Sequence, residues 1–366
     1  MKGLAALWYP AAGESSRAAR CALALLQPLA CLYGAGVRAR RLAYERGWLK
    51  AHAAGRPVIV VGNLTVGGTG KTPLILWLAE RLQARGLTVG IVSRGYGRQT
   101  GGARRAQAAS RWEEIGDEPL LVHRRTGCAV AVAEDRIIAA RRLAAEGVDV
   151  ILSDDGLQHL RLARDCAIVV IDGARGFGNG RLLPAGPLRE PASRALGADG
   201  IVVNADGIVV DDADGAGASR AADSGRAIAV LKDFAGPLAT MHLLLGEAHR
   251  LDGGGSPQPL TRFQGRPVHA VAGIGHPERF FRALAARGLE LIEHAFPDHH
   301  PFARGDLDYP DDLPILMTEK DAVRCASLAT PRMWHVPVET RLDEAGGAAL
   351  LALVARRIDA SRVPRR

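Results

Sequence analysis

The stretch that decides the fold is VIVVGNLTVGGTGKTPLILWL, residues 58–78. The short apolar run at its start predicts a buried strand, and the apolar spacing that follows Lys71 predicts a helix. The glycines between them allow backbone N–H groups to converge on an anion at the positive N-terminus of that helix. A strand, a glycine-rich turn and a helix in this order predict a phosphate-binding loop.

This loop supplies one cation and one hydroxyl. Lys71 can reach the β- and γ-phosphates of a nucleotide, and Thr72 can offer its hydroxyl to Mg²⁺. The general pattern G-x-x-x-x-G-K-[ST] expects a glycine where this chain has Thr65, so a plain glycine turn is the alternative. Because the chain has only five lysines against 42 arginines and one of them stands at the required position, we favour nucleotide binding. The residues expected to contact the nucleotide are Thr65, Gly67, Gly68, Thr69, Gly70, Lys71 and Thr72.

Length and charge narrow the class of protein. The 366 residues suffice for two domains, and the net charge of +8 favours an anionic partner. Aromatic residues are not interleaved with the basic ones as in single-strand binders, so we expect no nucleic acid. The five cysteines form no C-x-x-C pair and have no histidine-rich spacing, which argues against a zinc site and a disulfide framework. We also expect no protein partner.

Residues 17–45 predict a basic amphipathic helix. At helical spacing, arginines such as Arg17, Arg20 and Arg38 fall on one side, and leucines such as Leu25 and Leu29 fall on the other. Such a helix either lies in the face of an anionic membrane or packs on the domain as an ordinary helix. We favour the membrane surface.

Several charged residues follow predicted strands. Strand, helix and strand in sequence predict a parallel sheet, whose ligands bind beyond the carboxyl ends of the strands. Arg94 follows the second strand and is either a phosphate clamp or a solvated arginine. Asp154 and Asp155 follow the strand at 148–152, which places a carboxylate near Mg²⁺. Asp117 and Glu118 stand at a predicted helix start, where acidic residues are often simple caps.

The chain divides into segments of different character. Glycine and proline density in 172–191 indicates an ordered functional loop, whereas the Ala-, Gly- and Asp-rich segment 204–225 indicates an excursion on the surface. Residues 241–245 and 248–251 predict a two-stranded ribbon, and a second α/β unit follows it. The expected units are a membrane-associating helix in 1–48, a nucleotide-binding core in 49–235, a ribbon or linker in 236–266 and a C-terminal α/β domain in 267–366.

The assembled motifs resemble those of the tetraacyldisaccharide 4′-kinases of the lipid A pathway. They span nearly the full length in the order of that family, and the GGTGKT form of the loop explains Thr65. The segment 204–266 is the weakest match. The motifs are GNLTVGGTGKTP (62–73), SRGYGR (93–98), GDEP (116–119), DDGLQH (154–159), LPAGPLREP (183–191), GIGHPERFF (273–281), FPDHHPF (296–302) and TEKDAVRC (318–325).

The resemblance implies a function, a fold and a location. It implies ATP-dependent phosphorylation of the 4′-hydroxyl of an acylated glucosamine disaccharide 1-phosphate, giving lipid IVA. It implies a phosphate-loop parallel sheet core, a second, smaller α/β domain and a helix at the cytoplasmic face of the bacterial inner membrane, peripheral or monotopic. The alternative hypothesis is a nucleotide switch or a metallochaperone-type NTPase, which would use the same loop to change partner affinity.

The resemblance also implies roles for individual residues. Asp117 matches the proposed base, and His299 matches its partner, although the neighbouring His300 stays open on sequence alone. Lys71 and Mg²⁺ would neutralise the charge of the γ-phosphate. The candidates for Mg²⁺ contacts are Thr72, Glu118, Asp154 and Asp155, and those for contact with substrate are Arg94, Arg189 and Glu190.

Overall fold

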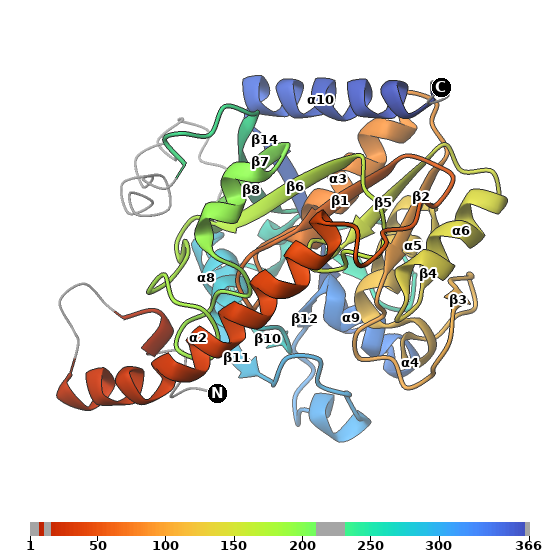
Figure 1. The fold of residues 1–366 in the computed structure, drawn as a ribbon. Helices are drawn as coiled ribbons and strands as arrows, with labels where there is room; N and C mark the ends of the chain where they lie inside the picture. The colour runs from red at the N-terminus through yellow and green to blue at the C-terminus, as the bar shows by residue number, and fades with distance from the viewer. Residues whose placement is uncertain (1–6, 11–15, 210–230, 363–366) are drawn as a thin grey trace.

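A computed structural model describes residues 7–10, 16–209 and 231–362 (Figure 1). These residues form two sheets, one of nine strands and one of five. Most of the predicted surface excursion in 204–225 lies outside the described residues, because 210–230 are not among them.

The nine-stranded sheet is built around the phosphate loop. Its seven inner strands run parallel, and the two edge strands, β14 and β3, are antiparallel to their neighbours. The parallel α/β core predicted from the sequence is therefore confirmed. In spatial order the strands are β14 (Val338–Leu342), β8 (Leu238–Leu245), β7 (Gly200–Val209), β6 (Cys166–Asp172), β1 (Val58–Gly62), β5 (Val150–Asp154), β2 (Val89–Ser93), β4 (Ala129–Val132) and β3 (Arg104–Arg105).

The central strand β1 is buried on both faces. Ile59 and Val61 belong to one hydrophobic cluster and Val58 and Val60 to another, as the alternation of side chains along a strand requires. The apolar run that predicted this strand lacks polar positions because helices cover both faces of the sheet.

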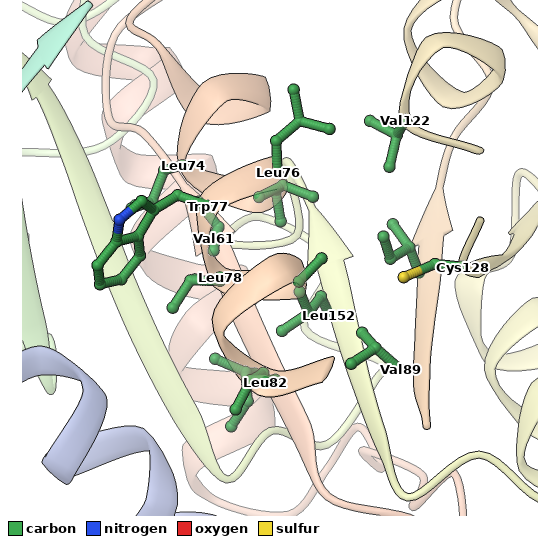
Figure 2. Packing of buried hydrophobic residues seen from close by; sticks show 14 of the residues in the cluster. Val61, Leu74, Leu76, Trp77, Leu78, Leu82, Val89, Val122, Cys128 and Leu152 are labelled. Atoms are coloured by element: carbon green, nitrogen blue, oxygen red, sulfur yellow. The ribbon is translucent and has the colours of Figure 1, made fainter. Parts of the chain in front are cut away.

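Helices cover the two faces of this sheet. On the first face α3 begins at Lys71, directly after the loop, and Figure 2 shows its buried leucines packed beside Leu152 of β5. Buried residues of α5 and α10 belong to the same cluster, while buried residues of α6 belong to the cluster on the other face. The helices are α3 (Lys71–Gln83), α4 (Trp112–Ile115), α5 (Asp117–Thr126), α6 (Arg136–Ala145) and α10 (Glu344–Arg362).

The second sheet forms a smaller α/β unit. Four of its strands are parallel, and only the edge strand β9 runs antiparallel. This second, smaller α/β unit was also predicted from the sequence. Its strands in spatial order are β11 (Glu290–Ala295), β10 (Pro267–Ala272), β12 (Ile315–Thr318), β13 (Met333–Val336) and β9 (His249–Arg250), and its helices are α8 (Pro277–Ala286) and α9 (Glu319–Cys325).

The predicted pairing within the ribbon is wrong. β8 and β9 are neighbours in the sequence but belong to different sheets, because β8 pairs with β7 and β14 and β9 pairs with β13. The chain also returns to the first sheet at its end, where β14 adds an edge strand and α10 packs on the core. Both parts of the ribbon are therefore present as strands, and their partners lie far away in the sequence.

A long helix, α2 (Arg17–Glu45), runs across one face of the molecule, and its N-terminal part extends past the sheets (Figure 1). Ser16 precedes the helix, and its side chain accepts a hydrogen bond from the N–H of Ala19 and so caps the helix. Toward its C-terminal half the helix contacts the loop after β6, where the hydroxyl of Tyr33 donates to the carbonyl of Arg189.

Candidate active site

The phosphate loop has the backbone geometry that its glycines predict. Gly67 and Gly70 have φ values of 98° and 96°, in the left-handed region that favours glycine. A Cβ at Gly70 would lie 2.7 Å from Nδ2 of Asn204, which donates to the carbonyl of Thr69 at 3.1 Å. Asn204 lies in β7 and its buried side-chain amide contacts the loop, so the loop is fixed by its own backbone and by this amide.

Lys71 is held at the start of α3 by two acceptors. Its Nζ donates to Oδ1 of Asn63 at 3.2 Å and lies 3.6 Å from Oδ1 of Asp155. Asn63 in turn donates from Nδ2 to the carbonyl of Gly67 at 3.3 Å. The cation predicted to reach the phosphates therefore lies over the loop, among groups that ligand phosphates can replace.

The carboxyl end of β5 carries two aspartates in different environments. Asp154 is buried, and its Oδ1 has no hydrogen-bond partner in the described part of the chain. Burial, and next the charge of Glu118, raise the pKa of Asp154 to about 7. Asp155 has a positive φ of 48°, and its carboxylate accepts from Arg189 at 3.0 Å. Asp154 is thus the aspartate with an unused, inward-facing oxygen.

The residues predicted to contact substrate lie on two loops. Arg189 contacts Asp155, as described, and the buried carboxylate of Glu190 accepts from Gln158 at 2.9 Å and from Arg194 at 3.2 Å. Arg94 is exposed at the carboxyl end of β2. The structure therefore brings Arg189 to Asp155, whereas Glu190 joins its own loop to the loop after β5.

Asp117 and His299 meet across the boundary between the two sheets. Oδ2 of Asp117, at the start of α5, accepts from Nδ1 of His299 at 2.9 Å, although the residues are 182 positions apart. Asp117 Oδ1 accepts from the N–H of Glu118 at 2.9 Å. His300 turns instead to Asp306 at 3.0 Å, so the structure pairs His299 with Asp117.

The Asp117 carboxyl stays ionised in this environment. Burial alone would raise its pKa, but the hydrogen bond from His299 and the charges of Lys320 and Arg324 outweigh burial and lower the pKa to about 2. His299 has a φ of 60°, unusual for a residue other than glycine, and its ring lies 5.0 Å from that of Tyr96. Strained backbone of this kind persists where the surroundings over-determine it, which is common at functional sites.

Two basic residues of α9 complete this part of the site. Lys320 Nζ donates to Oε1 of Glu118 at 2.8 Å and lies 3.4 Å from Nε2 of His299. Arg324 Nη1 contacts Oδ2 of Asp117 at 2.5 Å. Both residues belong to the motif at 318–325, but the sequence predicted no role for either. Their spacing of one helical turn, on a helix following a strand of the second unit, was the available signal.

Arg175 was also missed. It donates to the carbonyl of Gly68 in the phosphate loop and to Asp172 at 2.8 Å, and its Nη1 lies 2.6 Å from Nε2 of His276 in the second unit. Asp172 ends β6 and also contacts Arg279 of α8 at 3.0 Å. A second charged cluster therefore joins the two units beside the phosphate loop, and the signals in the sequence were an aspartate at the end of a strand and the glycine- and proline-rich loop that follows it.

A parallel sheet with a phosphate loop, and a carboxylate–histidine pair at its carboxyl edge, define a nucleotide-dependent phosphotransferase. The particular family follows from comparison with known proteins. A family model described as tetraacyldisaccharide-1-P 4′-kinase matches residues 22–355, so the chain belongs to this family of kinases.

Similar proteins cover most of the chain. The tetraacyldisaccharide 4′-kinase of Alkalilimnicola ehrlichii is 48% identical over 336 residues, which cover 90% of this chain and 92% of that protein. The enzyme of the same name from Xanthomonas euvesicatoria pv. vesicatoria is 47% identical and covers 88% and 90%. Among solved structures, LpxK from Aquifex aeolicus, described as in complex with ATP, has a TM-score of 0.73 at 28% identity and covers 92% of this chain and 99% of that one.

Proposed function

We propose that this chain transfers the γ-phosphate of ATP to the 4′-hydroxyl of a tetraacylated glucosamine disaccharide 1-phosphate, a step of lipid A biosynthesis that yields lipid IVA. Membership of the kinase family supports the acceptor, and the ATP complex of the Aquifex aeolicus relative supports the donor. The observation that carries the proposal is the 2.9 Å contact between Asp117 Oδ2 and His299 Nδ1. In this contact a carboxylate and an imidazole lie together where the two sheets meet, which supports a role for the pair in accepting the hydroxyl proton.

Different residues of the chain serve different requirements of phosphoryl transfer. Phosphoryl transfer needs the γ-phosphate and the attacking hydroxyl in line, neutralisation of charge and a group that receives the hydroxyl proton. Lys71 exchanges its contacts with Asn63 and Asp155 for phosphate oxygens. The ionised carboxylate of Asp117 fixes the ring of His299, and the pair receives the proton. Arg189, which faces Asp155, is our candidate for the phosphorylated side of the acceptor.

The residues present fit a bound Mg²⁺. Asp154 has a buried oxygen without a partner among the described residues, and Thr72 follows Lys71 at the start of α3. No group of three or more His, Cys, Asp or Glu side chains suited to a metal occurs in the described part of the chain, as expected where Mg²⁺ binds through one or two carboxylates and substrate phosphates. Asp154 and Thr72 would hold the ion, with Glu118 nearby. When bound, Mg²⁺ neutralises charge on the transferred phosphate.

The helix α2 supports attachment to the cytoplasmic face of the inner membrane. Leu25 and Leu32 are 79% and 72% exposed, and the helix is long and apolar enough by length and composition to cross a membrane. Its other side packs on the loop that contains Arg189 through Tyr33. We propose that the exposed leucines enter the acyl region while flanking arginines meet anionic headgroups, which holds the acceptor loop beside the lipid.

The kinase assay uses purified protein, labelled ATP and the acylated disaccharide 1-phosphate in mixed micelles, followed by separation of lipid products. Labelled lipid from the wild-type protein, and much less from His299→Ala, is the expected result. Nucleotide-binding protein that yields no labelled lipid refutes the proposal. A nucleotide switch would instead hydrolyse ATP slowly and equally well without the lipid acceptor.

A further inference from the structure

Arg324 lies fully buried on α9 between the two units of the molecule. Its side chain is 0% exposed. Nη1 contacts Oδ2 of Asp117 at 2.5 Å, and Nη2 donates to the carbonyl of Gly273 at 2.8 Å and also to Asp321. One guanidinium group therefore joins the nucleotide-binding core to the second unit at a single point.

The carbonyl of Gly273 is also hydrogen-bonded to His299. It accepts the backbone N–H of His299 at 3.2 Å as well as Nη2 of Arg324. The N–H of Gly273 donates to Oδ2 of Asp321 at 3.1 Å, so the carboxylate that neutralises the guanidinium also holds this glycine. Through its two nitrogens, Arg324 thus contacts the side chain of Asp117 and the carbonyl group that binds the backbone of His299.

We propose that Arg324 is a positioning residue that sets the distance and orientation between Asp117 and His299. This inference rests on the role proposed above for that pair. The guanidinium is planar and presents its donors in a fixed fork, so it holds two acceptors in a defined relation. A lysine presents one compact ammonium group and loses this geometry while it keeps the charge.

A positioning residue is needed because Asp117 and His299 belong to different units of the molecule. Asp117 begins a helix of the nucleotide-binding core, and His299 lies on a loop of the second unit with a strained φ of 60°. Neither unit alone fixes the contact between them. A displacement of about 1 Å between reacting groups lowers a rate about 100-fold, so the contact needs a rigid support.

The chain offers a matched control in Arg125. This residue of α5 also contacts α9, where its Nη1 donates to Oε2 of Glu319 at 2.8 Å, and it donates to the carbonyl of Val338 at 3.1 Å. It therefore joins the same two helices as Arg324 by a charged contact and a carbonyl contact. It does not belong to the network of Asp117 and His299 described above.

The experiment compares Arg324→Ala, Arg324→Lys and Arg125→Ala in the full-length protein with the labelled-ATP assay, and measures kcat, KM for ATP and Tm for each. We expect both Arg324 variants to lose about 100-fold in kcat while KM for ATP stays within about threefold, because the phosphate loop is untouched. Arg125→Ala should lower Tm and keep kcat within about threefold. Added guanidinium ion at millimolar concentration should restore part of the activity of Arg324→Ala and none to Arg324→Lys, which leaves no space for it.

Two results overturn the inference. One is that the Arg324 variants lose no more kcat than Arg125→Ala does, when the variants lose the same amount of Tm. The other is full activity in Arg324→Lys, the variant that keeps the positive charge and loses the fork of donors. Asp117→Asn, assayed beside them, separates the two proposals: if it keeps wild-type activity, the role of the pair fails, and if it alone is inactive, only the role of Arg324 fails.

Discussion

Replacement of Gly70 by alanine tests the phosphate loop most directly. Gly70 has a φ of 96°, and an added Cβ would lie 2.7 Å from Nδ2 of Asn204 and 2.8 Å from Cε of Met241. Distances below 3 Å require a neighbour to move. Because Asn204 is buried and holds the carbonyl of Thr69, its movement breaks the hydrogen bond that fixes the loop.

Two costs determine how much Gly70→Ala lowers the free energy of unfolding. A residue with Cβ in the left-handed region costs about 1–2 kcal/mol. Loss of the hydrogen bond from Asn204 to Thr69 costs about 1 kcal/mol more. We therefore expect Gly70→Ala to lower the free energy of unfolding by about 2–3 kcal/mol and to weaken binding of ATP, because the backbone N–H groups no longer converge.

Two other glycines separate the cost of a left-handed backbone from the cost of displacing Asn204. Gly86 has a φ of 78° with nothing within 4 Å of an added Cβ, and Gly68 has nothing within 4 Å and no positive φ. Chemical denaturation without nucleotide should give a loss of about 1–2 kcal/mol for Gly86→Ala, almost none for Gly68→Ala and the largest loss for Gly70→Ala. Equal stability of Gly70→Ala and Gly68→Ala would show that the described loop geometry is wrong.

The remaining predictions concern the acid–base pair, the metal, the membrane and pH. Asp117→Asn should lower kcat far more than it changes the apparent affinity for ATP, and an unchanged rate would remove Asp117 from the pair. Asp154→Asn should abolish the rise in Tm that Mg²⁺ causes in the presence of ADP; an undiminished rise would exclude Asp154 as a ligand. The double variant Leu25→Asp, Leu32→Asp should shift the protein from anionic vesicles to the supernatant in flotation, whereas unchanged partition would assign attachment to other surfaces. Burial, with the charges of His249 and Arg125, lowers the pKa of His335 to about 4. Since the unfolded chain then binds this proton more readily, stability should fall from pH 6.5 toward pH 4 by on the order of 3 kcal/mol, and His335→Asn should flatten that fall in denaturation curves.

The sequence pattern was sufficient to predict the part of the site whose residues lie close together in the chain. The strand β1, the loop and the start of α3 lie within about 20 residues, and their apolar periods, glycines and lysine together favour a phosphate-binding loop over a plain glycine turn. The aspartates at the end of β5 were placed correctly at the carboxyl edge of the sheet for the same reason, because a buried apolar run shows where a strand ends.

Contacts between distant segments could not be derived in this way. The strand β8 pairs with β7 and with β14, which comes about 95 positions later, whereas the sequence pattern assigned β8 to the adjacent apolar run of β9. The contact of Arg324 with Asp117 spans 207 positions. The sequence around Arg324 shows two basic residues one helical turn apart, but it does not show that Arg324 is buried, because the packing of α9 against α5 removes it from water. The pairing of Asp117 with His299 was predicted from the resemblance to a family and not from spacing.

The return of the chain to the first sheet makes the second unit an insertion within the core. Both connections pass through neighbouring antiparallel strands, since Val338 of β14 pairs with Leu245 of β8, and Gly246 donates from its N–H to the carbonyl of Pro337 at 2.9 Å. Residues 246–337 therefore leave the first sheet after β8 and return to it at β14, the neighbouring strand. A fragment that ends before residue 338 lacks the edge strand and α10, so separate expression of the nucleotide-binding core requires a short graft joining β8 to β14 and not a simple truncation.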